Sequence, residues 1–123
     1  EPAEAEKNFR YAIEIGDKTS PVTAGVFRGS LALLLTQTGS EEEAITIFEA
    51  GKQQLETYPS EYAKFICKQG IAQHLRGNTE AARKSLSEAK ALADQLHVKR
   101  SSELHQAIRH LAQDLDSQTK AES

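Results

Sequence analysis

The sequence predicts an all-α fold in which about six helices stack as antiparallel pairs. Two observations support this fold class: the composition and a repeat of small residues. Hydrophobic residues make up 38% of the 123 residues, but aromatic residues only 6%, and tryptophan is absent. A core of this composition consists mainly of Ala and Leu, which are strong helix formers and let helices pack closely.

The second observation is a recurring spacing of small residues, which is typical of a repeat architecture. Gly39 and Gly77 lie 38 residues apart, and each is followed by an alanine after five residues and a large apolar residue four further on. The four following positions are Ala44, Phe48, Ala82 and Leu86. A partial copy with similar spacing opens the chain at Ala5, Phe9 and Ala12. An ordinary helical bundle, which does not require such a period, is the alternative.

The chain begins with a half repeat, residues 3–17, and continues with a complete repeat over residues 20–58. Ser20 and Pro21 predict a helix start, with a capping side chain followed by a proline whose missing N–H costs nothing at this position. The apolar residues that follow keep to one helical face; they are Val22, Val26, Phe27, Leu31, Leu34 and Leu35. Gly39 is expected to end this helix.

The acidic run Glu41-Glu42-Glu43 predicts the start of the next helix. Ser40 and Glu43 have the spacing of a capping box, in which each side chain accepts a hydrogen bond from a free backbone N–H of the first turn. Tyr58 and Pro59 are expected to close this helix. Its apolar face contains Ala44, Ile47, Phe48, Gly51 and Leu55.

A second complete repeat covers residues 60–97, with Ser60 as the expected cap and Gly77-Asn78 as the break between its helices. The apolar residues of its two helices are Tyr62, Phe65, Ile66, Ala72 and Leu75, then Ala82, Leu86, Ala89, Leu92, Ala93 and Leu96. A closing helix, residues 101–117, starts near Ser101 or Ser102. It carries Leu104, Ile108, Leu111 and Leu115. Residues 1–117 therefore form a single domain, followed by a polar tail at 118–123.

These features resemble the tetratricopeptide (TPR) repeat family. The matching residues are Leu31, Ala32, Leu35, Gly39, Ala44, Phe48, Gly51 and Pro59, then Gly70, Gly77, Ala82, Leu86 and Ala89. The resemblance implies a right-handed α-solenoid that binds other proteins. The period of 38 residues exceeds the usual 34 by about one helical turn, as in a long-repeat variant. Gln69 and Gln73 stand where the family has large apolar residues, so either this helix is rotated or the layer is loosely packed.

Charge and hydropathy limit the partners that we expect. The 15 Lys and Arg residues and 18 Asp and Glu residues are interspersed, and the net charge of −3 argues against a nucleic acid partner. The longest apolar run, Leu31 to Leu35, has five residues, whereas a membrane span needs about 20. We expect no membrane partner and a cytoplasmic location. Because the chain opens in the first turn of a helix without Met, we expect it to be part of a longer protein.

Residues that could carry chemistry are few. The imidazoles are His74, His97, His105 and His110. His105 and His110 would point about 140° apart on a helix, so they cannot share a metal ion. Cys67, beside Ile66 in an apolar helix, is expected to be a packing residue. No sequence motif of a metalloprotease, a phosphate loop or a nucleophile elbow is present, so we expect no enzyme activity, metal or cofactor.

The resemblance to TPR proteins implies a concave groove lined by the first helix of each repeat. The residues expected to face it are Val26, Gly29, Leu33 and Gln37, then Lys64, Cys67, Ile71 and His74, and finally His105 and Arg109 on the closing helix. This set lacks the Lys, Asn and Arg pattern with which chaperone-binding members hold a C-terminal carboxylate. A helix or extended segment with apolar anchors is therefore the expected guest. Alternatively, Leu33 and Ile71 are core residues of a curved stack.

Two classes of function follow from this interpretation. The first is a protein–protein interaction scaffold, part of a larger protein, that binds a peptide or helix of its partner in the groove. The alternative is a self-association module of a larger bacterial regulatory or signalling protein, which would form a homo-oligomer. A half repeat at the start leaves an apolar face open, and a second copy would cover it.

Overall fold

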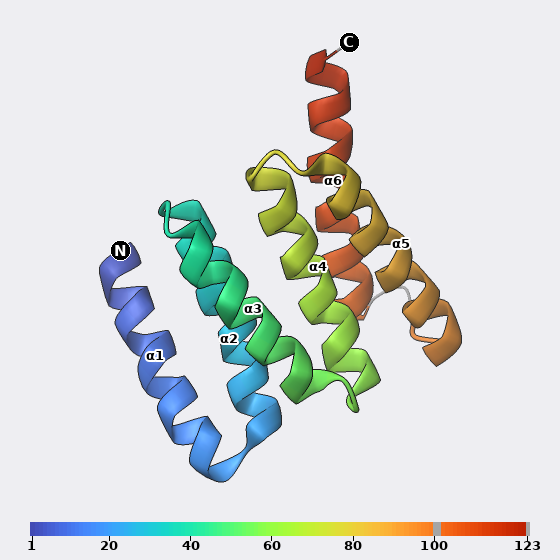
Figure 1. Ribbon diagram of the computed structural model, residues 1–123. Coiled ribbons are helices and arrows are strands. Elements are labelled where there is room, and N and C mark those ends of the chain that lie inside the picture. Colours follow the sequence, from blue (N-terminus) through green and yellow to red (C-terminus); the bar gives the residue numbers. More distant parts are fainter. Residues whose placement is uncertain (100–101, 123) are drawn as a thin grey trace.

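The computed structural model describes the backbone of residues 1–99 and 102–122, and the side chains of residues 1–99 and 102–117. This part of the chain contains six helices and no strand (Figure 1). The helices are α1 (Pro2–Thr19), α2 (Pro21–Gln37), α3 (Glu41–Leu55), α4 (Pro59–Leu75), α5 (Thr79–Leu96) and α6 (Glu103–Glu122). The predicted all-α class and the number of helices are confirmed.

The helices recur along the chain with the period read from the sequence. The two 17-residue helices α2 and α4 begin at Pro21 and Pro59, which lie 38 residues apart. The helices that follow them, α3 and α5, begin at Glu41 and Thr79, again 38 residues apart. The second helix pair therefore repeats the first, with each helix start displaced by 38 residues.

The turn inside each pair is the same in both copies. Gly39 and Gly77 have φ values of 96° and 85°, a left-handed conformation that glycine adopts without the steric cost of a Cβ. The residues that follow them donate equivalent hydrogen bonds back to the preceding helix. Ser40 N lies 2.8 Å from Leu35 O, and Asn78 N lies 2.8 Å from Gln73 O.

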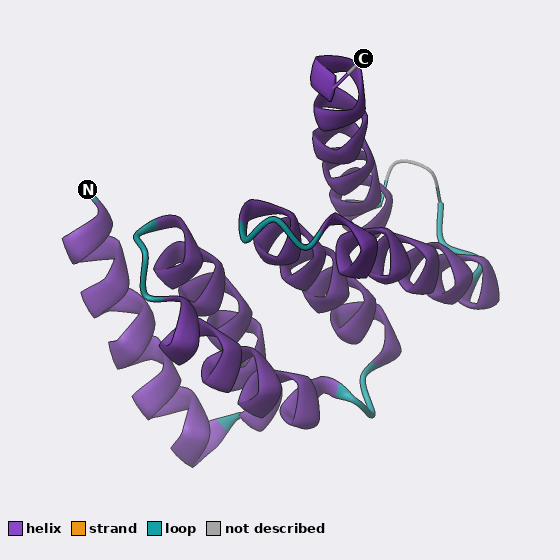
Figure 2. Ribbon diagram, turned by 45° about the horizontal axis from the view of Figure 1, so that its top comes forward, coloured by secondary structure: helices purple, strands orange, loops and turns teal. Residues whose placement is uncertain are grey.

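The packing of the helices also repeats. α2 contacts α4, and α4 contacts α6, so that these three helices form one layer. Each is covered by a neighbour in sequence: α1 and α3 pack on α2, and α5 packs on α4 and α6. Figures 1 and 2 show α1 at one end of the stack, while the C-terminal half of α6 extends beyond the other helices. This arrangement is consistent with a helical repeat.

The core consists mainly of aliphatic side chains, as the composition requires, with Phe48 and Phe65 among its few aromatic residues. The largest fully buried side chains are Leu31, Leu35, Leu55, Ile66, Leu104, Leu111, Leu115 and Cys67. Leu75 departs from the predicted apolar face of α4, because 53% of its surface is exposed. It lies nine residues after the buried Ile66, which places it about 180° around the helix and away from the core.

The predicted capping box at the start of α3 is wrong. Ser40 is the N-cap residue, but its side chain makes no capping hydrogen bond. The Glu43 carboxylate instead pairs with Arg10 of α1 at 2.9 Å, which links α3 to the first helix. A side-chain cap is present at the start of α6, where Ser102 Oγ accepts a hydrogen bond of 3.1 Å from His105 N. The other predicted start, Ser101, lies outside the described residues.

Two predicted boundaries also need correction. Pro59 does not close α3; it is the first residue of α4, with Tyr58 rather than Ser60 as the N-cap. A proline is favoured there because its missing N–H would have no partner in the first turn. The helix α6 continues to Glu122, so residues 118–122 of the predicted polar tail are helical, and residue 123 lies outside the described part.

A polar contact joins α4 to α5 where the sequence had suggested rotation or loose packing. The hydroxyl of Ser85, which is 4% exposed, donates a hydrogen bond of 2.7 Å to Gln73 Oε1. A buried hydroxyl with a partner does not carry the cost of an unsatisfied polar group. The glutamine at this position therefore takes part in the packing of α4 against α5.

Phe65 of α4 is the centre of the contact between the first and second helix pairs. Its ring is 2% exposed and lies against Gly29 of α2 and Gly51 of α3. A Cβ at Gly29 would lie 2.8 Å from the ring Cδ2, and one at Gly51 would lie 2.8 Å from the ring Cε2. The ring also meets Phe48 edge to face, with centroids 5.7 Å apart. The two glycines thus form a recess that holds the Phe65 ring.

We predict that Gly29→Ala destabilises the protein. Alanine is the better helix former by about 1 kcal/mol. Overpacking against the Phe65 ring costs about 1–3 kcal/mol, so we expect a lower free energy of unfolding in urea, followed by circular dichroism. The double variant Gly29→Ala/Phe65→Leu should lose less than the sum of the two single variants, because the smaller side chain makes room for the methyl group. A single variant more stable than the wild type would contradict this packing.

Candidate functional site

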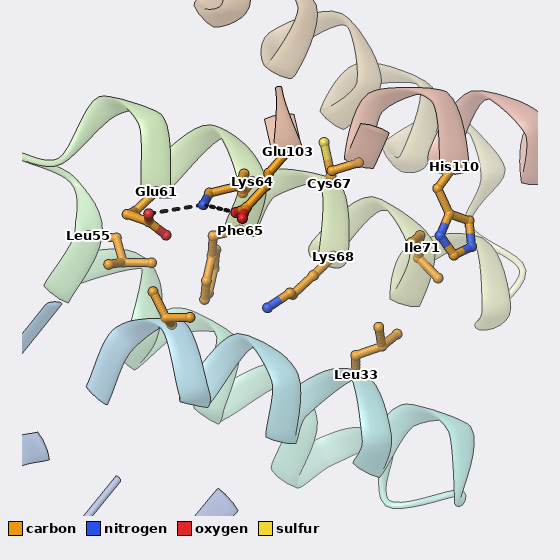
Figure 3. Close-up of a pocket in the computed structure, with 12 residues that line it drawn as sticks. Leu33, Leu55, Glu61, Lys64, Phe65, Cys67, Lys68, Ile71, Glu103 and His110 are labelled. Atoms are coloured by element: carbon orange, nitrogen blue, oxygen red, sulfur yellow. Dashed lines mark hydrogen bonds and ion pairs between the residues drawn. The ribbon is translucent and has the colours of Figure 1, made fainter. Parts of the chain in front are cut away.

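A cavity of about 390 Å³ lies between α2, α4 and α6, the three helices of one layer (Figure 3). This volume falls in the lower part of the range of about 300–1,000 Å³ that is usual for ligand sites. We call the cavity the α2–α4–α6 groove. Its lining residues are Val26 and Leu33 of α2, Leu55 of α3, Glu61, Lys64, Phe65, Cys67, Lys68 and Ile71 of α4, and Glu103, Ala107 and His110 of α6.

Helical periodicity explains why these side chains share the groove. On α4, Glu61, Lys64, Lys68 and Ile71 follow one another at steps of three, four and three residues, so they lie on one face of the helix. The lining residues of α6 keep similar steps, and the two of α2 are two turns apart. Each helix of the layer therefore presents one face to the same space.

The walls of the groove are largely apolar. Val26, Leu33 and Ile71 are only half-buried, whereas Phe65 behind them is buried. In Figure 3, Leu33 and Ile71 lie on opposite sides of the space between α2 and α4. These aliphatic groups remain partly accessible to solvent, so a bound apolar side chain would remove more of their surface from water.

Lys64 is neutralised at one side of the groove. Its Nζ lies 3.0 Å from Glu61 Oε1 on the same helix and 3.0 Å from Glu103 Oε2 on α6 (Figure 3). Burial disfavours the ammonium, but the hydrogen bonds to the two carboxylates outweigh this effect and raise the pKa of Lys64 above its ordinary value. This lysine therefore stays charged and joins α4 to α6.

Lys68, one turn further along α4, is in a different environment. Its Nζ donates a hydrogen bond of 3.0 Å to Ser30 Oγ of α2 and has no carboxylate partner among the described residues. In Figure 3 its side chain extends into the space between α4 and α2. Burial, together with the positive charge of Lys64, lowers the pKa of Lys68. The charge of Glu61 offsets part of this shift, but no described carboxylate contacts Lys68 directly, so the groove contains a half-buried ammonium without an ion pair.

The remaining polar chemistry near the groove is limited. Cys67 is 1% exposed, and burial raises the pKa of its thiol to about 12. The thiol is therefore protonated at neutral pH. Because only the thiolate is an effective nucleophile, Cys67 is not suited to nucleophilic chemistry. Among the described residues, no group of three or more His, Cys, Asp and Glu side chains could hold a metal ion. No helix in the same part of the chain is long and apolar enough to cross a membrane.

Five of the ten residues expected to face a groove line this cavity. They are Val26, Leu33, Lys64, Cys67 and Ile71. The other five do not line it; they are Gly29, Gln37, His74, His105 and Arg109. Gly29 is buried beneath the Phe65 ring, so it serves packing and offers no surface to a partner. Gln37 and Arg109 are exposed, and His74 and His105 are half-buried outside the cavity lining.

Sequence reasoning missed the most distinctive residue, Lys68. The predicted face of α4 ran through Lys64, Cys67, Ile71 and His74, whereas the observed face is turned toward Lys68. Lys68 follows Lys64 by four residues, so both lie on one helical face. This spacing could have indicated from the sequence that Lys68 faces the groove. The lining residues of α6 are likewise on a different face from the two that were expected.

We predict that Lys68→Met raises the stability of the free protein at neutral pH. A lysine whose pKa is lower in the folded than in the unfolded state costs stability at every pH below its folded-state pKa, where it is charged in both states. The variant should therefore unfold at higher urea concentration than the wild type. Its advantage should shrink as the pH rises through the lowered pKa of Lys68 toward the ordinary value of about 10.5.

The matched control for this experiment is Lys84→Met, which removes an exposed lysine from α5. We expect this change to leave the midpoint of unfolding almost unaltered, since surface substitutions are usually within about 0.5 kcal/mol. A loss of stability in Lys68→Met, or equal gains in both variants, would contradict the environment assigned to Lys68.

No family model, curated protein or solved structure matches this chain. Any account of its function therefore depends on the geometry and chemistry of the chain itself. The feature with the most specific chemistry is the α2–α4–α6 groove, with apolar walls, one neutralised lysine and one lysine without a counter-ion.

Proposed function

We propose that this chain is a protein–protein interaction scaffold that binds a helix or an extended segment of a partner protein in the α2–α4–α6 groove. The observation that carries the proposal is the apolar surface left partly exposed by Val26, Leu33 and Ile71 on helices of successive repeats. Concave sites of this kind usually combine apolar walls with a few polar groups that fix orientation. A segment with apolar side chains at helical spacing is suited to such a surface.

The repeated architecture supports the same function. Repeat proteins build extended binding surfaces from equivalent elements of successive units, and the groove is built from α2, α4 and α6 in this way. We further propose that the chain is a long-repeat relative of the TPR family and that its helix pairs wind as a right-handed solenoid. This proposal rests on the 38-residue recurrence of the helix starts and of the glycine turns.

A library of short random peptides displayed on phage tests this function. We expect selection on the wild-type protein to enrich peptides whose affinity falls at least about tenfold in Leu33→Glu and in Ile71→Glu. Each variant places a carboxylate in an apolar wall, where it is poorly solvated and repels apolar side chains. Both positions are only half-buried, so the helical circular dichroism spectrum should be retained.

The control for these variants is Ile45→Glu, which changes an isoleucine of α3 that is 52% exposed and does not line the groove. Binding of the selected peptides should be unaffected by this change. The scaffold proposal fails if selection enriches no peptide, or if the peptides bind the two groove variants as well as the wild type.

Self-association is the second candidate, and an exposed apolar pair on α1 favours it. Tyr11 is 65% exposed and Ile15 is 44% exposed, and they lie one turn apart on the helix at the end of the stack. A second copy of the chain would cover them in a symmetric contact. Light scattering over a wide range of concentrations should then show a dimer for the wild type and a monomer for Tyr11→Glu. A wild type that remains monomeric at the highest concentration would exclude this candidate.

A further inference from the structure

Two lysines of the groove differ in the partners of their ammonium groups. Lys64 has two carboxylate partners at 3.0 Å, whereas the described residues give Lys68 only the hydroxyl of Ser30. Removing an ammonium from water without a counter-charge is unfavourable, and residues kept in such positions often serve a ligand. Glu61 acts on Lys68 only at a distance, so Lys68 can still form one direct contact with a negatively charged group.

The position of Lys68 defines where the negative charge belongs in a bound segment. Along α4, Lys68 lies between Phe65 on one side and Ile71 on the other, with Leu33 facing Ile71 across the groove (Figure 3). Phe65 itself is buried, but on α2 the half-buried Val26 and Leu33 flank Ser30, the hydrogen-bond partner of Lys68, so accessible apolar surface lies about one helical turn from it in each direction. Ser30 Oγ accepts a hydrogen bond from Lys68. The hydroxyl of Ser30 can in turn donate its proton to an anion that is bound at Lys68.

We propose that the partner segment carries an Asp or Glu side chain, placed between two apolar side chains, whose carboxylate binds Lys68 while its neighbours fill the groove beside Val26 and Ile71. This inference rests on the proposed scaffold function and names the chemistry of the partner. The carboxylate supplies the missing counter-charge and accepts a charge-assisted hydrogen bond, which is among the stronger polar contacts in proteins.

The charges around the groove favour a single carboxylate over a polyanion. Glu61 and Glu103 lie next to Lys64 on the same cavity wall, and they repel the further phosphates of a nucleic acid or an anionic lipid surface. The net charge of −3 acts in the same direction. An isolated acidic residue in an apolar protein segment meets Lys68 without bringing additional negative charge close to these carboxylates.

Peptides selected on the wild-type protein from the random library test this inference. We expect the enriched peptides to share one Asp or Glu between two apolar residues. Replacing that residue by Asn or Gln should weaken binding to the wild type about tenfold or more. The same replacement should have almost no effect on binding to Lys68→Met, whereas Lys68→Arg and the control Lys84→Met should retain the preference for the acidic peptide.

The outcomes separate this inference from the scaffold function itself. Peptides that depend on Leu33 but lack an acidic residue, or whose acidic preference persists in Lys68→Met, overturn the inference and leave the scaffold function standing. A preference that disappears when the peptide C-terminus is amidated also overturns it, since the anion is then the terminal carboxylate. Failure to select any peptide overturns both. A dimer in light scattering that no peptide displaces also overturns both, because the groove then binds only a second copy of the chain.

Discussion

The seating of the Phe65 ring is the interaction on which the groove depends. Half of the residues that line the groove belong to α4, and the distance of α4 from α2 and α3 is set where the ring meets Gly29 and Gly51. Any larger side chain at either glycine would push α4 outward, because packed interiors have little free space. Lys64 precedes Phe65 directly and Lys68 follows it by three residues, so the same contact also fixes the depth of both ammonium groups.

The two lysines show how neighbouring positions on one helix acquire different chemistry from their surroundings. Lys64 meets Glu61 and Glu103, and the hydrogen bonds to these carboxylates more than offset its burial, so its pKa is raised. Lys68 faces α2 instead, where its partner is the hydroxyl of Ser30, and its pKa is lowered by burial and by the charge of Lys64. The difference creates polarity within an apolar groove, which can orient a bound segment as well as hold it.

The fold was largely predictable from sequence because its determinants are local. The glycine turns, the proline at the start of α2 and the apolar periodicity all act within a few residues. Apart from the boundaries at Pro59 and at the end of α6, the errors arose where distant residues decide. The predicted capping box failed because Glu43 meets Arg10, which lies 33 residues earlier in the chain. Lys68 was missed because its environment depends on Ser30, 38 residues earlier, and on the buried depth that α4 acquires by packing on α2.

The same reasoning explains the mixed result for the groove. Helical periodicity predicted that Val26 and Leu33 face a groove, and both line the cavity, whereas the neighbouring Gly29 lies beneath the Phe65 ring. Periodicity indicates which residues share a face of a helix. It does not show how far the next helix rotates around that face, because this rotation is set by side chains that interlock across the contact.

The most direct test of this account is a methyl NMR titration of the protein with a selected peptide. We predict that the largest shifts occur at the methyl groups of Val26, Leu33 and Ile71 in the groove. The exposed methyl groups of Ile15, Ile45 and Leu75, which lie outside the groove, should remain unchanged. Shifts confined to these outer positions, with the groove methyl groups unaffected, would show that partners bind another face of the molecule.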